Sequence, residues 1–469
     1  MLNYGLVSTA IAEDRQELRE GMRLLAKMAH KYKIPVTWAI TTDTAQFLAK
    51  DLTEWHNEFG DEPLLMLDIK SLWETNWVKL TGQSVPDANT ESEPVNISMA
   101  GASPEIIAEH LVKMRETLPR YIRTEWKKIQ RALEWATPNV AGAEWKNQVL
   151  VHALEQVGFR GLWGYRWDER GSVAEVDRGC PFGCFYPSAE QHNFSAPAAG
   201  SIAGIPYFSA AHLDNGADNL RASLINDTIQ QNYDLYVENQ EWNRWLSYVE
   251  HVSALEVTQL GQETLGKLDV YFAHVVSNEN TKLLPLSEMV DDYWTSCQQT
   301  EPTYIVATTL DSQDKSESME PDSAVLTNGD VPANQKEKRV FFYYDSECQF
   351  TFYDGVMEPA DMKNYISPPV LENVGGSISA QGTSIHGVEY HLPKIVNFRP
   401  NRKRSRLHIT FTIESTKAMP YGVAMWGNHL GLQLENSNAE VVTWVDKYLL
   451  FARLALEPGN NEFEIVLTI

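Results

Sequence analysis

A strand–helix–strand pattern in the middle of the chain constrains its fold more than any other feature of the sequence. A short apolar run that starts at Val140 ends at Glu144, and Val149–Phe159 then follows with helical periodicity. Gly158 stands where helices commonly end in the left-handed conformation. A second apolar run leads to Asp168. Such units build parallel sheets, because the helical crossover brings the next strand back in the same direction.

The side chains that follow these two runs are candidate site residues, because working residues in parallel α/β folds lie just past the strand ends. Glu144 and Asp168 are candidate catalytic carboxylates. Aromatic faces beside paired carboxylates suit a sugar ring, which stacks on them while its hydroxyls form hydrogen bonds. The aromatic candidates for substrate binding are Trp145, Trp163, Tyr165 and Trp167. An ordinary buried strand with helix-capping carboxylates would give the same pattern, so both interpretations stay open.

Alternating strand and helix patterns fill residues 1–310, which we predict to be one catalytic domain. The strands predicted beyond the central unit are Tyr4–Ile11, Ile34–Ile40, Pro63–Ile69, Ile202–His212, Asp269–Val276 and Thr303–Leu310. The predicted helices are Leu18–Ala29, Thr42–Leu52, Leu220–Glu250, Leu286–Cys297 and a long segment from Ser103 to about Trp135. Pro119 should break or kink the long segment. This alternation predicts a (β/α) barrel, closed or nearly so.

Three further segments complete the predicted organisation. Gly171–Ala199 is a long loop with several Gly, Pro and aromatic residues, and we expect it to wall the site, because such loops in compact domains are usually functional. Residues 311–338 carry seven acidic and three basic residues, which predicts an acidic linker or surface loop. From 339 to 469, short β-patterned runs separated by turn residues predict a β-sandwich domain.

Composition excludes several classes of function. The formal net charge of −24 argues against nucleic-acid binding, because phosphate contact requires clustered Lys and Arg. No apolar run approaches the roughly 20 residues of a membrane span, and no signal peptide precedes the first predicted strand. Four cysteines are too few for a disulfide scaffold. We therefore expect a cytoplasmic protein with no nucleic-acid or membrane partner, and leave open whether it forms a homo-oligomer.

Several stretches resemble the NodB-like polysaccharide deacetylase superfamily, including a branch with an added β-domain. They are Tyr4–Asp14, Ile34–Ile40, Ala141–Glu144 and Ala153–Phe159. The resemblance covers roughly residues 1–310 and implies the fold class α/β, a distorted (β/α)7-type barrel followed by an all-β sandwich domain. Typical members hold a divalent metal with one Asp and two His, and use a second Asp as base. Asp14 matches the acidic position expected after the first strand.

The metal ligands are where this sequence departs from the family. The paired histidines expected after the third strand are missing, and Met66–Lys70 and Trp73–Trp77 stand in their place. Imidazole ligands are what allow such a site to hold zinc-like ions, so we predict no metal and no cofactor. A replacement ligand set would have to come from Asp14, Asp68, His212, Asp214 and His274.

The barrel is also similar to that of retaining glycosidases of families fifty-seven and thirty-eight. This similarity implies a nucleophilic Glu after the fourth strand, a position that Glu144 matches. The second carboxylate would come from Asp168, Asp214 or Glu279. A separation of about 5–5.5 Å between the two carboxyl groups would give retention, and roughly 6.5–9.5 Å would give inversion.

We predict a carbohydrate-active hydrolase and favour glycosidic-bond cleavage by Glu144 with a second carboxylate. Further catalytic candidates are Asp14 and His212, and further substrate-binding candidates are Asp68, Asp214 and His274. Ordinary roles compete with these: a carboxylate can start a helix, and a lone histidine in an apolar run is often a core residue. The alternatives are metal-dependent deacetylation of an amino sugar or acylated glycan, and a non-catalytic sugar-binding barrel.

Overall fold

The computed structural model describes residues 1–469 except Glu13, 82–103, 144–147, 165–182, 187–201, 207–219, 299–302, 310–337, Ile469 and short segments between 347 and 448. The chain forms two compact units. The first comprises Met1–Gln240 with Arg244–Glu301, and the second comprises Glu241–Asn243 with Pro302–Ile469. Among the described helices, none is long and apolar enough to cross a membrane.

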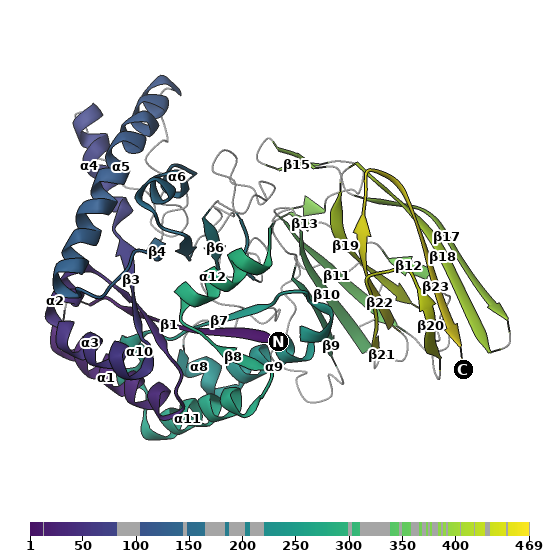
Figure 1. Cartoon of the computed structure of the whole chain (residues 1–469), viewed down its shortest axis with the longest axis horizontal. Helices are drawn as coiled ribbons and strands as arrows, with labels where there is room; N and C mark the ends of the chain where they lie inside the picture. Colours follow the sequence, from purple (N-terminus) through teal and green to yellow (C-terminus); the bar gives the residue numbers. More distant parts are fainter. Residues whose placement is uncertain are drawn as a thin grey trace. The chain divides into compact units, whose positions relative to one another are not determined.

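The first unit is built around a parallel sheet with the strand order β6-β5-β4-β3-β2-β1-β7 (Figure 1). Its strands are β1 (Leu2–Ala10), β2 (Val36–Ile40), β3 (Glu62–Leu67), β4 (Val140–Ala143), β5 (Gly161–Trp163), β6 (Ala203–Ile205), β7 (Ser247–His251) and β8 (Thr281–Leu283). β8 pairs with Leu2–Tyr4 at the start of β1. It lies on the side of β1 opposite β7, which is the side that β2 pairs with from Leu6 onward. All of these pairings are parallel. The predicted α/β fold is confirmed as a curled, parallel half-barrel.

Helices connect the strands and cover the sheet. They are α1 (Arg15–Lys31), α2 (Thr42–Phe47), α3 (Ala49–Phe59), α4 (Ile69–Thr81), α5 (Pro104–Ala132), α6 (Gln148–Val157), α8 (Leu220–Ile225), α9 (Thr228–Glu238), α10 (Ala254–Gln259), α11 (Gln262–Ser277) and α12 (Leu286–Ser296). A short 3-10 helix, η2 (Gln240–Trp242), follows α9 in the chain. The stripe predicted for α1 is buried and consists of Leu18, Met22, Leu25 and Ala29. Gly158 ends α6 at φ +98°, which confirms the predicted left-handed cap.

One face of the sheet, which we call the inner face, is covered by α12 near the amino ends of the strands. The inner-face residues that share a core cluster with α12 include Val7, Ala39, Leu64 and Val249. Gly161 permits this close approach, because a Cβ there would lie 2.8 Å from Val290. The first turn of α12 is held by hydrogen bonds: the N–H of Leu286 donates to Thr37 Oγ1 at 3.0 Å, and the next N–H donates to Glu62 Oε1 at 2.9 Å. The amino half of the inner face is therefore filled.

The strand predicted at Asp269–Val276 is wrong, because this segment lies in α11. Its apolar run belongs to a helical face, since the buried residues recur at three- and four-residue spacing. They are Leu268, Tyr271, Phe272 and Val275. A short apolar run with aromatic residues does not distinguish a buried helix from a buried strand by periodicity alone.

The long helix predicted at Leu220–Glu250 is wrong in its second half. The chain forms α8, α9 and η2 over residues 220–242 and then enters β7, four residues of which lie inside the predicted helix. Pro119 does not break the helix, because α5 continues through it, and the predicted kink stays a prediction. Buried residues on both sides of this proline, such as Met114 and Trp126, anchor both halves of the helix.

The second unit consists of antiparallel β-sheets. Its strands are β9 (Tyr304–Thr309), β10 (Lys338–Ser346), β11 (Gln349–Met357), β12 (Tyr365–Ser367), β13 (Glu372–Asn373), β14 (Gly376–Ser377), β15 (Thr383–Ile385), β16 (Val388–Tyr390), β17 (Lys394–Lys403), β18 (Arg406–Ser415), β19 (Met419–Trp426), β20 (Gln433–Ser437), β21 (Val441–Asp446), β22 (Leu449–Leu456) and β23 (Gly459–Thr468). Two four-stranded sheets, β12-β19-β22-β21 and β17-β18-β23-β20, contribute buried side chains to one core cluster. This agrees with the predicted all-β region that follows the barrel.

Strand β18 illustrates why this unit folds as layered sheets. Leu407, Ile409, Phe411 and Ile413 are buried, while the residues between them are partly or fully exposed. This period of two places one face on a core and the other in water.

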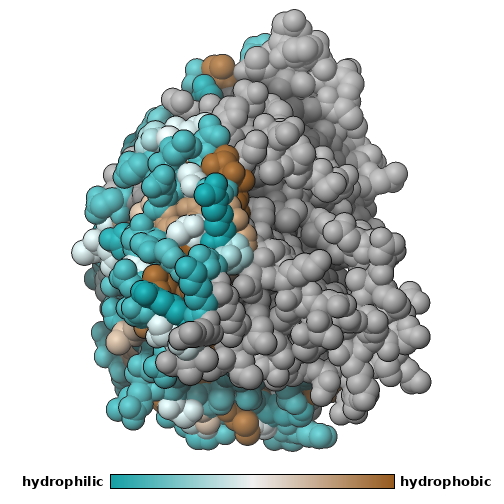
Figure 2. Space-filling view, turned by 90° about the vertical axis from the view of Figure 1, so that its right-hand side faces the viewer, coloured by the Kyte–Doolittle hydropathy of each residue, from teal (hydrophilic) through white to brown (hydrophobic). Residues whose placement is uncertain are grey.

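The described surface in Figure 2 is mainly hydrophilic, with small apolar areas rather than one large apolar patch. The predicted linker, 311–338, lies outside the described residues except for its last one.

Candidate functional site

The carboxyl ends of β1–β5 and β7 meet at one edge of the parallel sheet, which we call the carboxyl edge. Described acidic residues follow three adjacent strands along it: Asp14 after β1, Asp43 after β2 and Asp68 after β3. All three are exposed. The sequence continues this series with Glu144, directly after β4 and outside the described residues. The edge is therefore rich in carboxylates at the place where parallel folds position their chemistry.

His251, the last residue of β7, is a second kind of group at this edge. It stands opposite Val7 of β1, and its Nε2 lies 3.0 Å from Thr9 Oγ1. The centroids of the His251 and Trp163 rings are 5.6 Å apart. Burial lowers the pKa of His251 from its usual value of 6.5 to about 4, because a charged imidazole would lose its hydration. The imidazole is therefore neutral at neutral pH.

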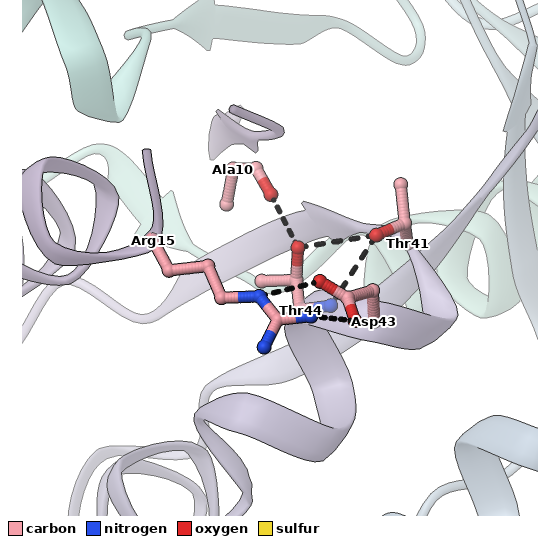
Figure 3. A network of polar contacts seen from close by, with 5 residues as sticks. All are labelled: Ala10, Arg15, Thr41, Asp43 and Thr44. Atoms are coloured by element: carbon pink, nitrogen blue, oxygen red, sulfur yellow. Dashed lines mark hydrogen bonds and ion pairs between the residues drawn. The ribbon is translucent and has the colours of Figure 1, made fainter. Parts of the chain in front are cut away.

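A polar network fixes the ends of β1 and β2 at the carboxyl edge (Figure 3). The Thr44 hydroxyl donates to the carbonyl of Ala10 at 3.0 Å, and the Thr44 N–H donates to Thr41 Oγ1 at 3.3 Å. Arg15 contacts Asp43 through Nε at 3.1 Å and a terminal nitrogen at 2.5 Å. The Arg15 and Asp43 side chains are more than half exposed, so solvent screens their attraction. The hydroxyl bonds hold this end of the sheet in place.

Asp14 and Asp68 both use their carboxylates to begin helices. Asp14 Oδ1 accepts the N–H groups of Gln16 and Glu17 at 2.8 and 3.1 Å, at the start of α1. Asp68 Oδ1 accepts the N–H of Ser71 at 3.0 Å, at the start of α4. The competing interpretation, in which these carboxylates start helices, is therefore correct for both residues. Their exposed position at the carboxyl edge also leaves their catalytic and substrate-binding roles as predictions.

Trp163 is buried at the carboxyl end of β5, with 1% of its surface exposed. Its indole packs across the glycine of β4 toward β3. A Cβ on Gly142 would lie 2.4 Å from Met66 Sδ and 3.1 Å from the Trp163 ring. Trp163 is therefore a packed core residue near His251, and direct contact with a sugar stays a prediction.

Most of the predicted site residues lie outside the described part of the chain. These are Glu144, Trp145, Tyr165, Trp167, Asp168, His212 and Asp214. The predicted wall, Gly171–Ala199, is described only at residues 183–186, where Cys184, Phe185 and Tyr186 are buried. The roles predicted for all of these residues stay predictions.

His274 and Glu279 lie near the opposite end of the sheet. His274 belongs to the last turns of α11, and its Nε2 contacts Asp234 of α9 at 2.5 Å. Glu279 lies in the turn before β8, which pairs with Leu2–Tyr4 at the start of β1. The placement of His274 at a strand end is thus wrong, since the segment forms a helix that ends near the amino end of β1.

Sequence reasoning missed His251, because β7 was assigned to a helix. The signal that could have found it is the run Ser247–His251, in which Tyr248 and Val249 have high strand propensity. The run ends in a histidine, and Ser253 follows as a helix N-cap. These features indicate a short strand with a polar residue at its carboxyl end.

The described residues do not fit the Asp-His-His metal set that the resemblance implies. Asp14 is present, but its Oδ1 caps α1, and no histidine follows β3. Among the described residues, no group of three or more His, Cys, Asp or Glu side chains could hold a metal ion. We therefore assign no step of a reaction to a metal.

No family model matches the chain, and no curated protein matches it. Among solved structures, a chain assigned as a polysaccharide deacetylase from Mycobacterium smegmatis is similar, with a TM-score of 0.37 and 11% identity over 62% of this chain and 89% of that one. A probable polysaccharide deacetylase from Pseudomonas aeruginosa PAO1 has a TM-score of 0.36 and 10% identity over 62% and 90%. A 4-alpha-glucanotransferase from Thermococcus litoralis has a TM-score of 0.36 and 8% identity over 100% and 99%. Polysaccharide deacetylases, the family that the sequence resembles, are thus among the solved structures found.

Proposed function

We propose that this protein is a carbohydrate-active hydrolase that cleaves glycosidic bonds at the carboxyl edge of its parallel sheet. The observation that carries the proposal is the series of acidic residues after adjacent strands, at the edge of the sheet where β7 ends in the neutral His251. Glycosidic-bond hydrolysis needs two carboxyl groups, one to donate a proton and one to attack the sugar or activate water. Adjacent strands lie about 4.8 Å apart, so neighbouring strand ends suit the roughly 5–5.5 Å separation of a retaining pair.

Glu144 is the proposed nucleophile or acid/base, because it directly follows β4 and continues this series along the sheet. Its partner is Asp168, which follows β5, the neighbour of β4. Asp14 and Asp68 are the described alternatives at the same edge. A neutral His251 would bind sugar hydroxyls without bringing a charge into the site.

The test compares wild type with Glu144→Gln on a panel of oligosaccharides and acetylated oligosaccharides, measuring new reducing ends and free acetate. Gln keeps the volume of the side chain but can neither attack a sugar carbon nor transfer a proton. We expect new reducing ends from wild type and a loss of at least about 10³-fold in kcat in the variant, with an unchanged melting temperature. The matched control is Glu263→Gln, an exposed residue in the first turn of α11, which should keep full activity.

Three other outcomes would change the assignment. Full activity in a stable Glu144→Gln protein would remove this residue from the mechanism. Acetate release without new reducing ends would support deacetylation, for which Asp14 holds the acidic position expected after the first strand. Saturable sugar binding measured by calorimetry, with no turnover on the panel, would support a sugar-binding barrel.

A further inference from the structure

His251 meets a strand that is distant from its own in the sheet. β5 and β7 are separated by β4, β3, β2 and β1. In a flat sheet, five steps of about 4.8 Å would place the two strands roughly 24 Å apart. The centroids of the Trp163 and His251 rings are instead 5.6 Å apart. The sheet therefore curls far enough for the side chains of β5 and β7 to meet across the inner face.

This crossing brings the imidazole near the two strands that lead to the proposed carboxylate pair. Trp163 is the last residue of β5, and a Cβ on Gly142 of β4 would lie 3.1 Å from its ring. In sequence, Glu144 is the second residue after Gly142, and Asp168 is the fifth residue after Trp163. A sugar bound where these two strands end would therefore lie near the His251 ring.

Thr9 of β1 contacts this imidazole through its hydroxyl. Thr9 stands two positions after the residue of β1 that pairs with His251, so both side chains lie on the inner face. Thr9 Oγ1 is 3.0 Å from Nε2 of the ring. The preceding residue of β7, Glu250, faces the other side of the sheet, where its buried carboxylate accepts the hydroxyls of Tyr248 and Tyr271. Thr9 is therefore the candidate for fixing the ring.

The direction of the hydrogen bond follows from the proton of the Thr9 hydroxyl. A neutral imidazole has one N–H and one nitrogen lone pair, whereas a hydroxyl can donate or accept. Among the described residues, Thr9 Oγ1 has no second hydrogen-bond partner. If the hydroxyl donates to Nε2, its proton is used and the ring proton belongs to Nδ1. If Nε2–H donated instead, the hydroxyl proton would remain without a described acceptor.

We propose that Thr9 is a positioning residue: its hydroxyl donates to Nε2 of His251, which places the imidazole proton on Nδ1 and fixes the ring on the inner face. This role rests on the proposed function and deepens it, because it makes His251 a hydrogen-bond donor. With its Nε2 lone pair occupied, the neutral ring offers Nδ1–H to an oxygen and does not act as a general base through Nε2. Proton transfer is then the task of carboxylates, as glycosidic-bond hydrolysis requires.

The experiment determines which ring nitrogen of His251 carries the proton, from the nitrogen-15 shifts of the full chain labelled at histidine. It is done without sugar at about pH 7, far above the pKa of about 4, and His251→Gln identifies the signals by their loss. We expect the Nδ1–H form to exceed the Nε2–H form by about 5- to 10-fold in wild type, the factor that one hydrogen bond contributes. Thr9→Val keeps the shape of the side chain and should lower this ratio at least about fivefold. Thr9→Ser returns the hydroxyl and should restore the ratio.

Thr44→Val is the matched control, because it removes another hydroxyl at the carboxyl edge, one that donates to the carbonyl of Ala10. It should leave the His251 ratio unchanged. A wild-type ring protonated on Nε2, or an equal ratio in wild type and Thr9→Val, would overturn the inference. An equal change in Thr44→Val would also overturn it, since the ratio would then report a general loosening of the edge. Thr9→Ala takes the place of Thr9→Val if the latter does not fold.

Sugar is absent from this measurement, so its outcome does not depend on glycosidase activity. An Nδ1–H ring that loses its preference in Thr9→Val would support the role of Thr9 even if the oligosaccharide panel shows no turnover. The lack of turnover would then contradict the proposed function alone. If the protein does cleave glycosidic bonds, Thr9→Val should lower kcat/KM by about 3- to 10-fold, and Thr9→Ser should stay close to wild type.

Discussion

The two ends of the parallel sheet use their carboxylates in opposite ways. At the amino end, Asp61 is 1% exposed and accepts hydrogen bonds from His30, Trp38 and the N–H of Val36, at 2.7–3.1 Å. At the carboxyl edge, Asp14, Asp43 and Asp68 are exposed, and they cap helices or pair with a solvated arginine. Carboxylates that are fully partnered stabilise a fold, whereas exposed ones at strand ends can meet a ligand. The same residue type therefore has a structural role at one end and an accessible position at the other.

Asp61→Ala gives the largest expected effect on stability and tests the amino end. The change leaves the His30 ring, the Trp38 indole N–H and a backbone N–H without their acceptor in the core. We expect the free energy of unfolding to fall by about 3–5 kcal/mol, measured by urea denaturation. Glu116→Ala, which removes an exposed partner of Lys113, should leave the urea midpoint nearly unchanged. If Asp61→Ala lowered the free energy of unfolding by less than about 1 kcal/mol, Asp61 would have no larger structural role than the exposed carboxylates at the carboxyl edge.

Glu250→Gln tests the pH dependence of stability near the carboxyl edge. The pKa of Glu250 is raised in the folded protein, from 4.5 to about 7, so the folded state binds the proton more tightly than the unfolded state. Its stabilising contribution is complete below pH 4.5 and is lost as pH rises through 7. Gln does not ionise, so the variant should gain on wild type between pH 5 and 8, by on the order of 3 kcal/mol. If the free energies of unfolding of the two proteins, measured by urea denaturation, changed with pH in the same way, this expectation would be wrong.

Gly161→Ala measures how tightly α12 closes the amino end. The added Cβ would lie 2.8 Å from Val290 and 3.1 Å from Val140, both β-branched and buried. We expect a loss of about 1–3 kcal/mol by differential scanning calorimetry, because a packed core resists an extra methyl group. Gly266→Ala is the control, since a Cβ there meets nothing within 4 Å. In α11 this control should raise stability by about 0.5–1 kcal/mol. Equal effects at both glycines would mean that the contact with α12 is loose.

Thr44→Val carries the smallest expected effect and probes the network of Figure 3. Valine keeps the shape of threonine and removes the hydroxyl that donates to the Ala10 carbonyl. The expected loss is about 1 kcal/mol, read from the thermal midpoint. Arg15→Gln, which removes only the exposed contact to Asp43, should change the midpoint less than Thr44→Val does. The reverse order would place the stability of this edge in the ion pair.

The parallel sheet could be predicted from the sequence because its signals are local. The apolar runs of β1–β3 each stand before a helical pattern, and α6 ends at Gly158. β7 could not be assigned as easily, because a five-residue strand follows two short helices without a clear change of composition. The strand prediction at Asp269–Val276 was wrong because the apolar residues of this run are as compatible with a helix as with a strand.

The candidate site was predictable in position and not in detail. The strand ends place Asp14 and Asp68 at the carboxyl edge, but only the fold reveals that both begin helices. The neutral state of His251 depends on burial beside Trp163 and Thr9, which belong to other strands. Such a shift arises from tertiary contacts, so no spacing within one segment could indicate it.

The closure of the amino end by α12 has a consequence for how the first unit folds. α12 comes after all eight strands of the sheet in the chain, yet its first N–H bonds to Thr37, 249 positions earlier. The side chain of Asn3 likewise donates to Asp292 of α12 at 3.4 Å, across 289 positions. Contacts this distant in sequence slow folding, because a long loop must close before they form. During synthesis, α12 can therefore cover the amino half of the inner face only after the chain has been made through residue 296, so these apolar strand residues wait longest for their packing partner.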